Sequence, residues 1–191
     1  MRITLKEVVI AYAQGIFEAR VPEQGGDPKY TAAFLFSKDH SAVKQLTDAV
    51  VAVAKEKWGV KADETLKQLK AADRLPVHSG DAKPNSAGYA SKLYVNAGNK
   101  IRPVVIDANK GALTAADGRP YSGSVVNVIL DIWPQDNKFG KRINASLLGV
   151  QFVRDGERLA GGSMATADDF EALPGTEGET APKSAADALF S

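Results

Sequence analysis

Apolar segments of strand length alternate with turn-forming segments at the start of the chain. Residues 3–13 are rich in β-branched side chains and predict a strand, and residues 16–21 predict a second, shorter one. Residues 22–29 hold two prolines and two glycines, which are typical of a turn or mobile loop. Residues 30–36 form a largely apolar run, as expected for a strand buried on both faces. The aromatic residues assigned to the core are Tyr12, Phe17, Phe34, Phe36 and Phe152.

The spacing of apolar residues then changes from strand-like to helical. A first helix is expected to begin after a cap at Ser37 or Asp39 and to end at Gly59, because short polar side chains cap helix N-termini and glycine favours helix C-termini. Residues 63–72 predict a second, shorter helix, and the pair is expected as one insertion at about residues 39–73, covering one end of a sheet. The apolar face of the first helix consists of Val43, Leu46, Val50, Val53 and Ala54.

The chain from residue 74 predicts a long exposed loop followed by further strands. About six strands with one helical insertion, and without β-α-β alternation, predict a mainly β protein. We expect a partly open Greek-key barrel of the oligonucleotide-binding (OB) type over residues 1–158, with a β-sandwich as the alternative that strand periodicity leaves open. The later strands are expected at residues 89–97, 101–107, 123–133 and 143–154.

Charge divides the chain into two unequal parts. Residues 1–158 hold 23 bases and 17 acids, a net charge of +6, whereas residues 159–191 hold one base and six acids, a net charge of −5. The second segment has few large apolar residues, so we expect a flexible acidic tail that cannot bury enough surface to offset its ordering entropy. A basic body with an acidic tail indicates nucleic-acid binding, although a solubilising tail on a neutral domain has the same composition.

Composition excludes several classes of chemistry. The chain has no cysteine and only two histidines, which argues against thiol nucleophiles, Cys-ligated metals and histidine-based hydrolase sites. Phosphate-binding glycine loops and a G-x-S-x-G elbow are also missing, and no run reaches the length of a membrane span. We therefore expect no enzyme activity, cofactor, metal or membrane association. A metal-dependent nuclease using Asp107, Asp131 and Asp136 stays open as an alternative.

Basic residues interleaved with aromatic ones remain as the strongest candidate for a site. Single-stranded nucleic acid requires cations along the phosphates and flat side chains on which bases stack, and this set supplies both. Stacking does not discriminate the sugar, so RNA binding also stays open. The expected contacts are Lys92, Tyr94, Lys100, Arg102, Tyr121, Trp133, Phe139, Lys141 and Arg142.

The chain from its first strand to Glu157 resembles a phage protein family, most strongly from Arg102 onward. The segment from Tyr121 to Val128, the segment from Trp133 to Asn137 and the run from Leu147 to Glu157 carry the likeness, together with residues 102–107. They are similar to single-stranded-DNA-binding proteins of tailed phages, formerly a domain of unknown function. The resemblance implies an OB fold, sequence-independent binding of single-stranded DNA, a role in phage replication or recombination, and a location in the cytoplasm of the bacterial host.

The tip of the acidic tail has its own expected role. Relatives in such phages carry acidic tails that end in an aromatic residue and contact replication enzymes, and Asp187, Leu189 and Phe190 match that pattern, followed here by Ser191. We expect the tail to recruit replication or recombination proteins and to compete with DNA for the basic surface. The oligomeric state stays open, a homo-oligomer included, and a virion structural or assembly protein remains a further alternative.

Overall fold

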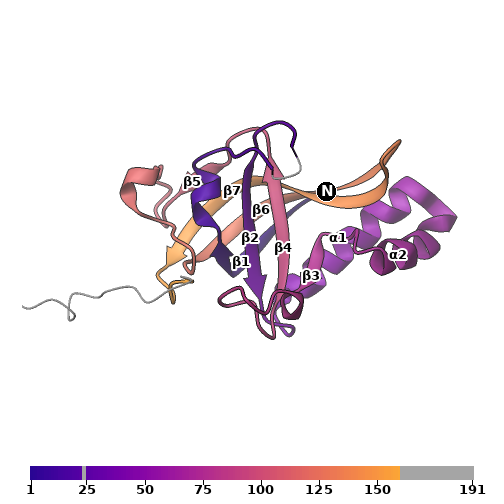
Figure 1. Ribbon diagram of the computed structural model, residues 1–191, viewed down its shortest axis with the longest axis horizontal. Coiled ribbons are helices and arrows are strands. Elements are labelled where there is room, and N and C mark those ends of the chain that lie inside the picture. Colours follow the sequence, from indigo (N-terminus) through magenta and orange to yellow (C-terminus); the bar gives the residue numbers. More distant parts are fainter. Residues whose placement is uncertain (23–24, 160–191) are drawn as a thin grey trace, which may run out of the picture. The chain divides into compact units, whose positions relative to one another are not determined.

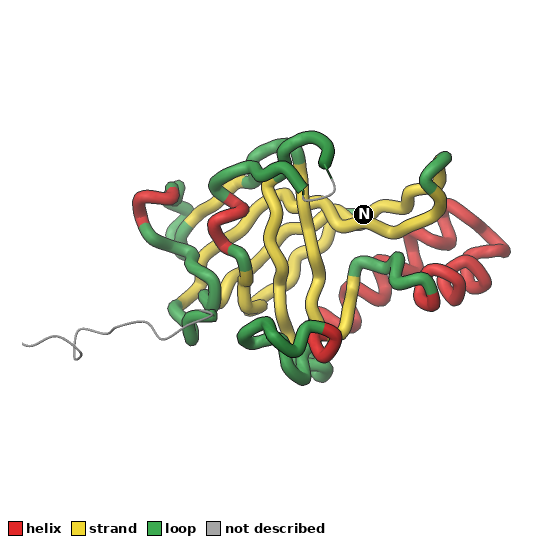
Figure 2. Tube along the Cα trace, in the orientation of Figure 1, coloured by secondary structure: helices red, strands yellow, loops and turns green. Residues whose placement is uncertain are grey.

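The computed structural model describes residues 1–22 and 25–159, and within them more residues lie in strands than in helices (Figures 1 and 2). Two α-helices follow the second strand, α1 (Ser41–Trp58) and α2 (Ala62–Ala71). Short 3-10 helices lie at Ala13–Ile16, Gly59–Lys61, Gly80–Ala82 and Ala115–Asp117. The strands are β1 (Arg2–Ala11), β2 (Tyr30–Phe36), β3 (Val77–Ser79), β4 (Leu93–Asn99), β5 (Val104–Ile106), β6 (Val125–Asn137) and β7 (Gly140–Arg154).

The strands form one sheet that curls into a partly open barrel. Their order is β3-β4-β2-β1-β6-β7-β5, with every pair antiparallel except β5 and β7. In Figure 1, β2 and β4 cross in front of β6 and β7, and β4 packs against β7 although the ladder does not join them. A side chain bridges this gap, since Asn99 Nδ2 donates to the Leu147 carbonyl at 3.1 Å. The predicted mainly β, OB-like barrel with a helical insertion is confirmed.

A bulge in β1 explains why its apolar residues do not alternate. The register against β6 shifts between Leu5 and Val8, where Glu7 adopts a φ of 53° and donates its N–H to Asn127 Oδ1 at 3.0 Å. The extra residue changes the phase of the strand, so that Leu5, Val8 and Ile10 are all fully buried. A period of two along this run therefore predicts a strand but not which of its residues face inward.

The barrel has a main core and a smaller one on the outside of β2 and β4. Ala32, Phe34 and Phe36 belong to the main core, whereas Ala33 and Leu35 pack outward beneath the loop that joins β3 to β4. The strand over residues 30–36 is thus buried on both faces, as the sequence predicts. The outer cluster is completed by Ala11, Tyr89 and Tyr94, with Val9 and Leu159 packed against it.

The helical insertion packs against β1 and β6 and lies beside the far end of the β6–β7 hairpin (Figure 1). Gly59 ends α1 as expected, with a φ of 54° and its N–H donated to the Lys55 carbonyl. The expected N-terminal cap at Ser37 or Asp39 is wrong, because His40 Nδ1 accepts from the Ala42 N–H at 3.1 Å. An imidazole nitrogen here replaces the short polar side chains that cap most helices.

Several strand boundaries differ from those expected. The strand predicted over residues 16–21 is wrong: Ala13–Ile16 is a 3-10 helix, and only a single bridge joins Arg20 to Lys29. The expected long loop holds the short strand β3, while β6 and β7 extend past the expected turn to form a longer hairpin. Tyr12 is not in the core, since it is 56% exposed.

Candidate nucleic-acid interface

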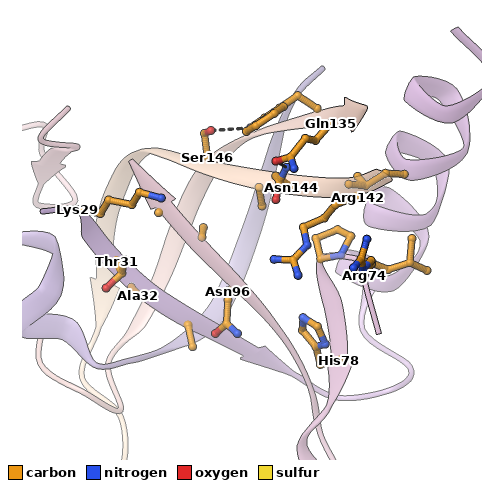
Figure 3. A pocket seen from close by; sticks show the side chains of 18 of the residues that line it. Lys29, Thr31, Ala32, Arg74, His78, Asn96, Gln135, Arg142, Asn144 and Ser146 are labelled. Atoms are coloured by element: carbon orange, nitrogen blue, oxygen red, sulfur yellow. Dashed lines mark hydrogen bonds between the residues drawn. The ribbon is translucent and has the colours of Figure 1, made fainter. Parts of the chain in front are cut away.

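A cleft of ≈ 650 Å³ lies where the outer face of β2 and β4 meets β6 and β7 (Figure 3). One wall carries Thr31 and Asn96, and the opposite wall carries Gln135, Asn144 and Ser146. The positions 142, 144 and 146 alternate with the buried 143, 145 and 147, so the polar side chains of β7 point outward into the cleft. The segment from Asp73 to His78 closes the end nearest α2.

Trp133 provides an aromatic surface on this second wall. It is 39% exposed, and its indole Nε1 donates to Ser146 Oγ at 2.9 Å, the dashed bond in Figure 3. The bond holds the polar edge of the ring against β7 and lets the apolar faces border the cleft. A fixed, half-exposed indole is a suitable surface for stacking a base or another flat group.

Three basic side chains line the cleft and lack a counter-ion. Lys29, Arg74 and Arg142 form no salt bridge with a carboxylate anywhere in residues 1–22 and 25–159. Figure 3 shows the Arg142 guanidinium projecting into the space above His78. Arg74 is held by the hairpin through a bond from Nη1 to the Lys141 carbonyl at 3.4 Å. Uncompensated cations in a concave surface attract polyanions.

One carboxylate among the described residues, Asp73, borders the cleft, and it contacts a histidine there. Asp73 Oδ1 lies 2.9 Å from His78 Nδ1, and the His78 ring packs against Tyr94 with centroids 5.3 Å apart. Three bases against one acid leave the lining positive whether or not His78 is protonated. The lining therefore combines a net positive charge with a half-exposed aromatic ring.

Only two of the nine residues expected from the sequence line the cleft. These are Trp133 and Arg142. Lys141 and Phe139 follow on the same hairpin: Lys141 Nζ lies 5.8 Å from the Trp58 ring centroid, and Phe139 is 73% exposed beside Lys138. The hairpin thus carries four of the nine residues, two inside the cleft and two beyond it.

The other five lie outside the lining. Tyr94 is 6% exposed and packs edge-on against Tyr89, so its ring faces are covered. Lys100 forms a salt bridge with Asp27, and Tyr121 exchanges two hydrogen bonds with the backbone of Gly156. The last two residues are the half-buried Lys92 and the exposed Arg102.

Sequence reasoning missed Lys29, Arg74 and Tyr12 as lining residues. The composition around Lys29 predicts a loop, and Arg74 marks the end of the helical insertion, so neither lies near an expected basic strand. Tyr12 ends an apolar run, which predicts a core residue. Its left-handed backbone, with a φ of 58°, turns the ring outward. A tyrosine at this position does not predict a left-handed backbone.

The three aspartates of the nuclease hypothesis are not brought together. Asp107 accepts the backbone N–H groups of Asn109 and Gly111, which makes it a turn former. Asp131 forms a salt bridge with the N-terminal ammonium at 2.9 Å, and Asp136 accepts the indole N–H of Trp58 at 2.9 Å. Across the described ranges, no three acidic or histidine side chains form a group that could hold a metal ion. The proposed carboxylate cluster is therefore wrong.

Among the same residues, no helix combines the length and hydropathy needed to cross a bilayer. The barrel and its cleft define a mainly β protein with a concave, positively charged surface. A family model described as Enterobacter phage Enc34, ssDNA-binding protein, matches residues 1–181. The chain belongs to this family.

Individual relatives agree with this assignment. Putative protein p50 of Acyrthosiphon pisum secondary endosymbiont phage 1 is 40% identical over 182 residues, which cover 94% of this chain and 97% of that protein. The single-stranded DNA-binding protein from bacteriophage Enc34, solved in complex with ssDNA, matches with a TM-score of 0.69 and 27% identity over 83% of this chain and 89% of that one. The family and its solved member are DNA-binding proteins rather than enzymes.

A more distant structure shares the fold. The gp2.5 single-stranded DNA-binding protein of bacteriophage T7 matches with a TM-score of 0.50 and 14% identity, over 95% of this chain and 99% of that chain. The resemblance predicted from the C-terminal motifs is thus confirmed at the level of the family and the fold.

Proposed function

We propose that this chain is a sequence-independent single-stranded-DNA-binding protein that acts in phage DNA replication or recombination. The observation that carries the proposal is the cleft with the half-exposed Trp133 and three basic side chains that form no salt bridge within residues 1–22 and 25–159. Phosphates lie against Lys29, Arg74 and Arg142, and a base stacks on the indole. The Enc34 relative, which was solved with ssDNA, supports the same class of ligand.

The path of the DNA strand is expected to continue along the hairpin. Phe139 and Lys141 lie beyond Arg142 on the same hairpin and offer the same pair of chemical groups. Lys92, Lys100 and Arg102 remain predicted phosphate contacts outside the cleft, and of these Lys100 would first have to leave Asp27. Tyr94 and Tyr121 remain predictions with less structural support, because one ring is buried and the other is tied to Gly156.

Tryptophan fluorescence on adding oligo-dT tests the proposal. The chain has two tryptophans, and Trp58 is held outside the cleft by its bond to Asp136. We expect quenching at low salt that persists in Trp58→Phe and disappears in Trp133→Phe. Duplex DNA of the same length should bind more weakly, because a paired base cannot stack on a protein ring.

Two results would overturn the proposal. Equal affinity for duplex and single strands would point to a general polyanion surface. No retention of DNA at low salt would favour the alternative of a virion structural or assembly protein, in which the barrel serves protein contacts.

The acidic tail is part of the proposed function. Asp187, Leu189 and Phe190 lie outside the described residues, as does nearly all of the segment 159–191. We propose that this segment competes with DNA for the basic surface and recruits replication or recombination proteins through its apolar tip. Charge supports this, because residues 159–191 carry a net charge of −5 and residues 1–158 a net charge of +6.

A truncation after Leu159 separates the two parts. Leu159 is retained because its N–H donates to the Ser122 carbonyl at 2.9 Å and its side chain packs against the outer core cluster. Removal of residues 160–191 should tighten binding to oligo-dT most at low salt, where charge competition is strongest. Unchanged or weaker binding contradicts the competition. A matched variant, Leu189→Ser with Phe190→Ser, keeps the charge and should lose only the partner.

A further inference from the structure

Three tyrosines gather around one lysine at the edge of the cleft. Lys83 Nζ lies 4.8 Å from the ring centroid of Tyr94, 5.2 Å from that of Tyr89 and 6.0 Å from that of Tyr12. These distances fall within the range in which an ammonium is attracted to an aromatic face. We call Tyr12, Tyr89 and Tyr94 the tyrosine cluster.

The cluster joins the outer core to the cleft. Tyr89 and Tyr94 are 2% and 6% exposed and belong to the outer core, whereas Tyr12 is 56% exposed and lines the cleft. Tyr94 also packs against His78, which borders the cleft too. The Lys83 ammonium therefore lies near two buried rings, Tyr89 and Tyr94, and near the solvent-exposed ring of Tyr12.

Lys83 is a half-buried cation without a counter-ion. It forms no salt bridge with a carboxylate in the ranges 1–22 and 25–159. A lysine that served only the stability of its loop would be expected to pair or to reach fully into water, since an ammonium is strongly hydrated. Held in place by rings, it keeps its charge available for an incoming anion.

The conformation of Tyr12 indicates a role beyond packing. Its left-handed backbone, with φ 58° and ψ 40°, is unfavourable for a residue with a side chain. The following 3-10 turn fixes it, since Gly15 packs so tightly on β2 that a Cβ there would lie 2.2 Å from the Thr31 carbonyl oxygen. Strained backbone that the surroundings enforce tends to occur at ligand sites. Here the strain presents an aromatic ring to the cleft.

The buried tyrosines also carry a cost that phenylalanine would avoid. The Tyr89 hydroxyl is buried and has no hydrogen-bond partner among the described residues. An unsatisfied buried hydroxyl destabilises a core. The Tyr89 ring face nevertheless lies 5.2 Å from the Lys83 ammonium, and a phenylalanine ring would attract this cation in the same way.

We propose that Tyr12 and Lys83 form a separate nucleotide subsite at the end of the cleft: Tyr12 stacks one base and Lys83 neutralises one phosphate. Tyr89 and Tyr94 position the ammonium and do not touch DNA. The subsite rests on the proposed function, since it needs a strand in the cleft, and it adds a second stacking surface besides Trp133. Both rings line the cleft.

Paired substitutions test the subsite. Tyr12→Leu keeps an apolar side chain but removes the ring, and we expect it to weaken oligo-dT binding about 5- to 160-fold while leaving the salt dependence unchanged. Tyr12→Phe keeps the ring and should bind as the parent does. Lys83→Gln should lower the slope of log K against log salt by about 0.7, the value for one phosphate contact on a single strand.

Controls separate a binding effect from a folding effect. Lys67→Gln removes an exposed lysine on α2 outside the cleft and should leave both affinity and slope unchanged. Thermal melts of each variant show whether the loop still packs. Photo-crosslinking of the parent to bromodeoxyuridine oligonucleotides should place a crosslink on Tyr12, a result that reduced stability cannot imitate.

The outcomes distinguish the subsite from the cleft. If the parent does not bind single strands at all, the proposed function fails and the subsite with it. If the parent binds, and Arg142→Gln weakens binding while Tyr12→Leu and Lys83→Gln do not, the cleft stands and the subsite is refuted. If Tyr12→Phe weakens binding as much as Tyr12→Leu, the effect comes from the hydroxyl and stacking is refuted.

Discussion

Salt dependence gives the sharpest quantitative prediction about the cleft. Its three basic residues, Lys29, Arg74 and Arg142, each neutralise one phosphate in the proposed complex. Each contact on a single strand contributes about −0.7 to the slope of log K against log salt, so three contacts give a slope of about −2.1. From about 50 to about 200 mM monovalent salt, these three contacts alone should lower the affinity about 18-fold, and each further phosphate contact steepens the fall.

Arg142→Gln removes one contact and keeps the length of the side chain approximately. Two contacts give a slope of about −1.4, and the same change in salt then costs only about 7-fold. If the two curves meet near 1 M salt, the variant binds about 8-fold more weakly at 50 mM and about 3-fold more weakly at 200 mM. Lys83, if it acts as proposed, steepens both curves by the same amount and leaves their difference intact.

The assay is an oligo-dT titration followed by fluorescence anisotropy at four or more salt concentrations. It uses the truncation after Leu159, so that the acidic segment does not add a salt dependence of its own. Lys67→Gln on α2 serves as the charge-matched control. A slope near zero for the parent, or the same slope for Arg142→Gln and the parent, would refute the assignment of these cations to phosphates.

Two further predictions concern the structure that supports the cleft. Gly80→Ala should destabilise the fold by about 1–3 kcal/mol, because a Cβ there would lie 2.0 Å from the Tyr89 carbonyl oxygen. Gly149→Ala should destabilise it less, because its Cβ would lie 3.4 Å from the nearest atom. Urea unfolding measures both variants, and a larger loss of stability in Gly149→Ala would contradict this reading of the packing. Burial raises the pKa of Tyr94, with the Asp73 carboxylate adding to the effect, so the stability it contributes is present below about pH 10, the unfolded value, and is lost as pH rises through the folded pKa. The loss of stability above about pH 10 should therefore shrink in Tyr94→Phe, and an unchanged alkaline profile would show that the ring is solvated.

The sequence predicts the architecture better than it predicts the site. The helical insertion, its end at Gly59 and the doubly buried strand at residues 30–36 all follow from periods that packing enforces over many residues. The strand expected at residues 16–21 fails because Tyr12 and Gly15 divert the chain into a 3-10 turn. This turn depends on Tyr12, on Gly15 and on the close approach of Gly15 to the Thr31 carbonyl. The local sequence pattern does not predict a contact between residues so far apart.

The candidate site is built from contacts between distant segments, and this limits prediction more than residue chemistry does. Trp133 and Arg142 lie on facing strands of one hairpin and are predictable, because hairpin pairing is local. Lys29 and Arg74 approach them only after the barrel curls β4 against β7. Tyr94 alternates correctly along its strand, but the loop carrying Tyr89 folds over it and buries the ring.

The cleft is built from segments that are distant in the sequence. Residues 29, 31–33 and 96–98 form one side, residues 133, 135 and 142–146 the other, and residues 73–76 and 78 the end, so separating any of these segments abolishes the site as a whole. Occupancy and global folding are therefore thermodynamically linked: a ligand held at about 100 times its dissociation constant should add about 2.7 kcal/mol to the free energy of unfolding. Melting temperature then reports ligand occupancy directly, and a fragment of the barrel should show no residual affinity.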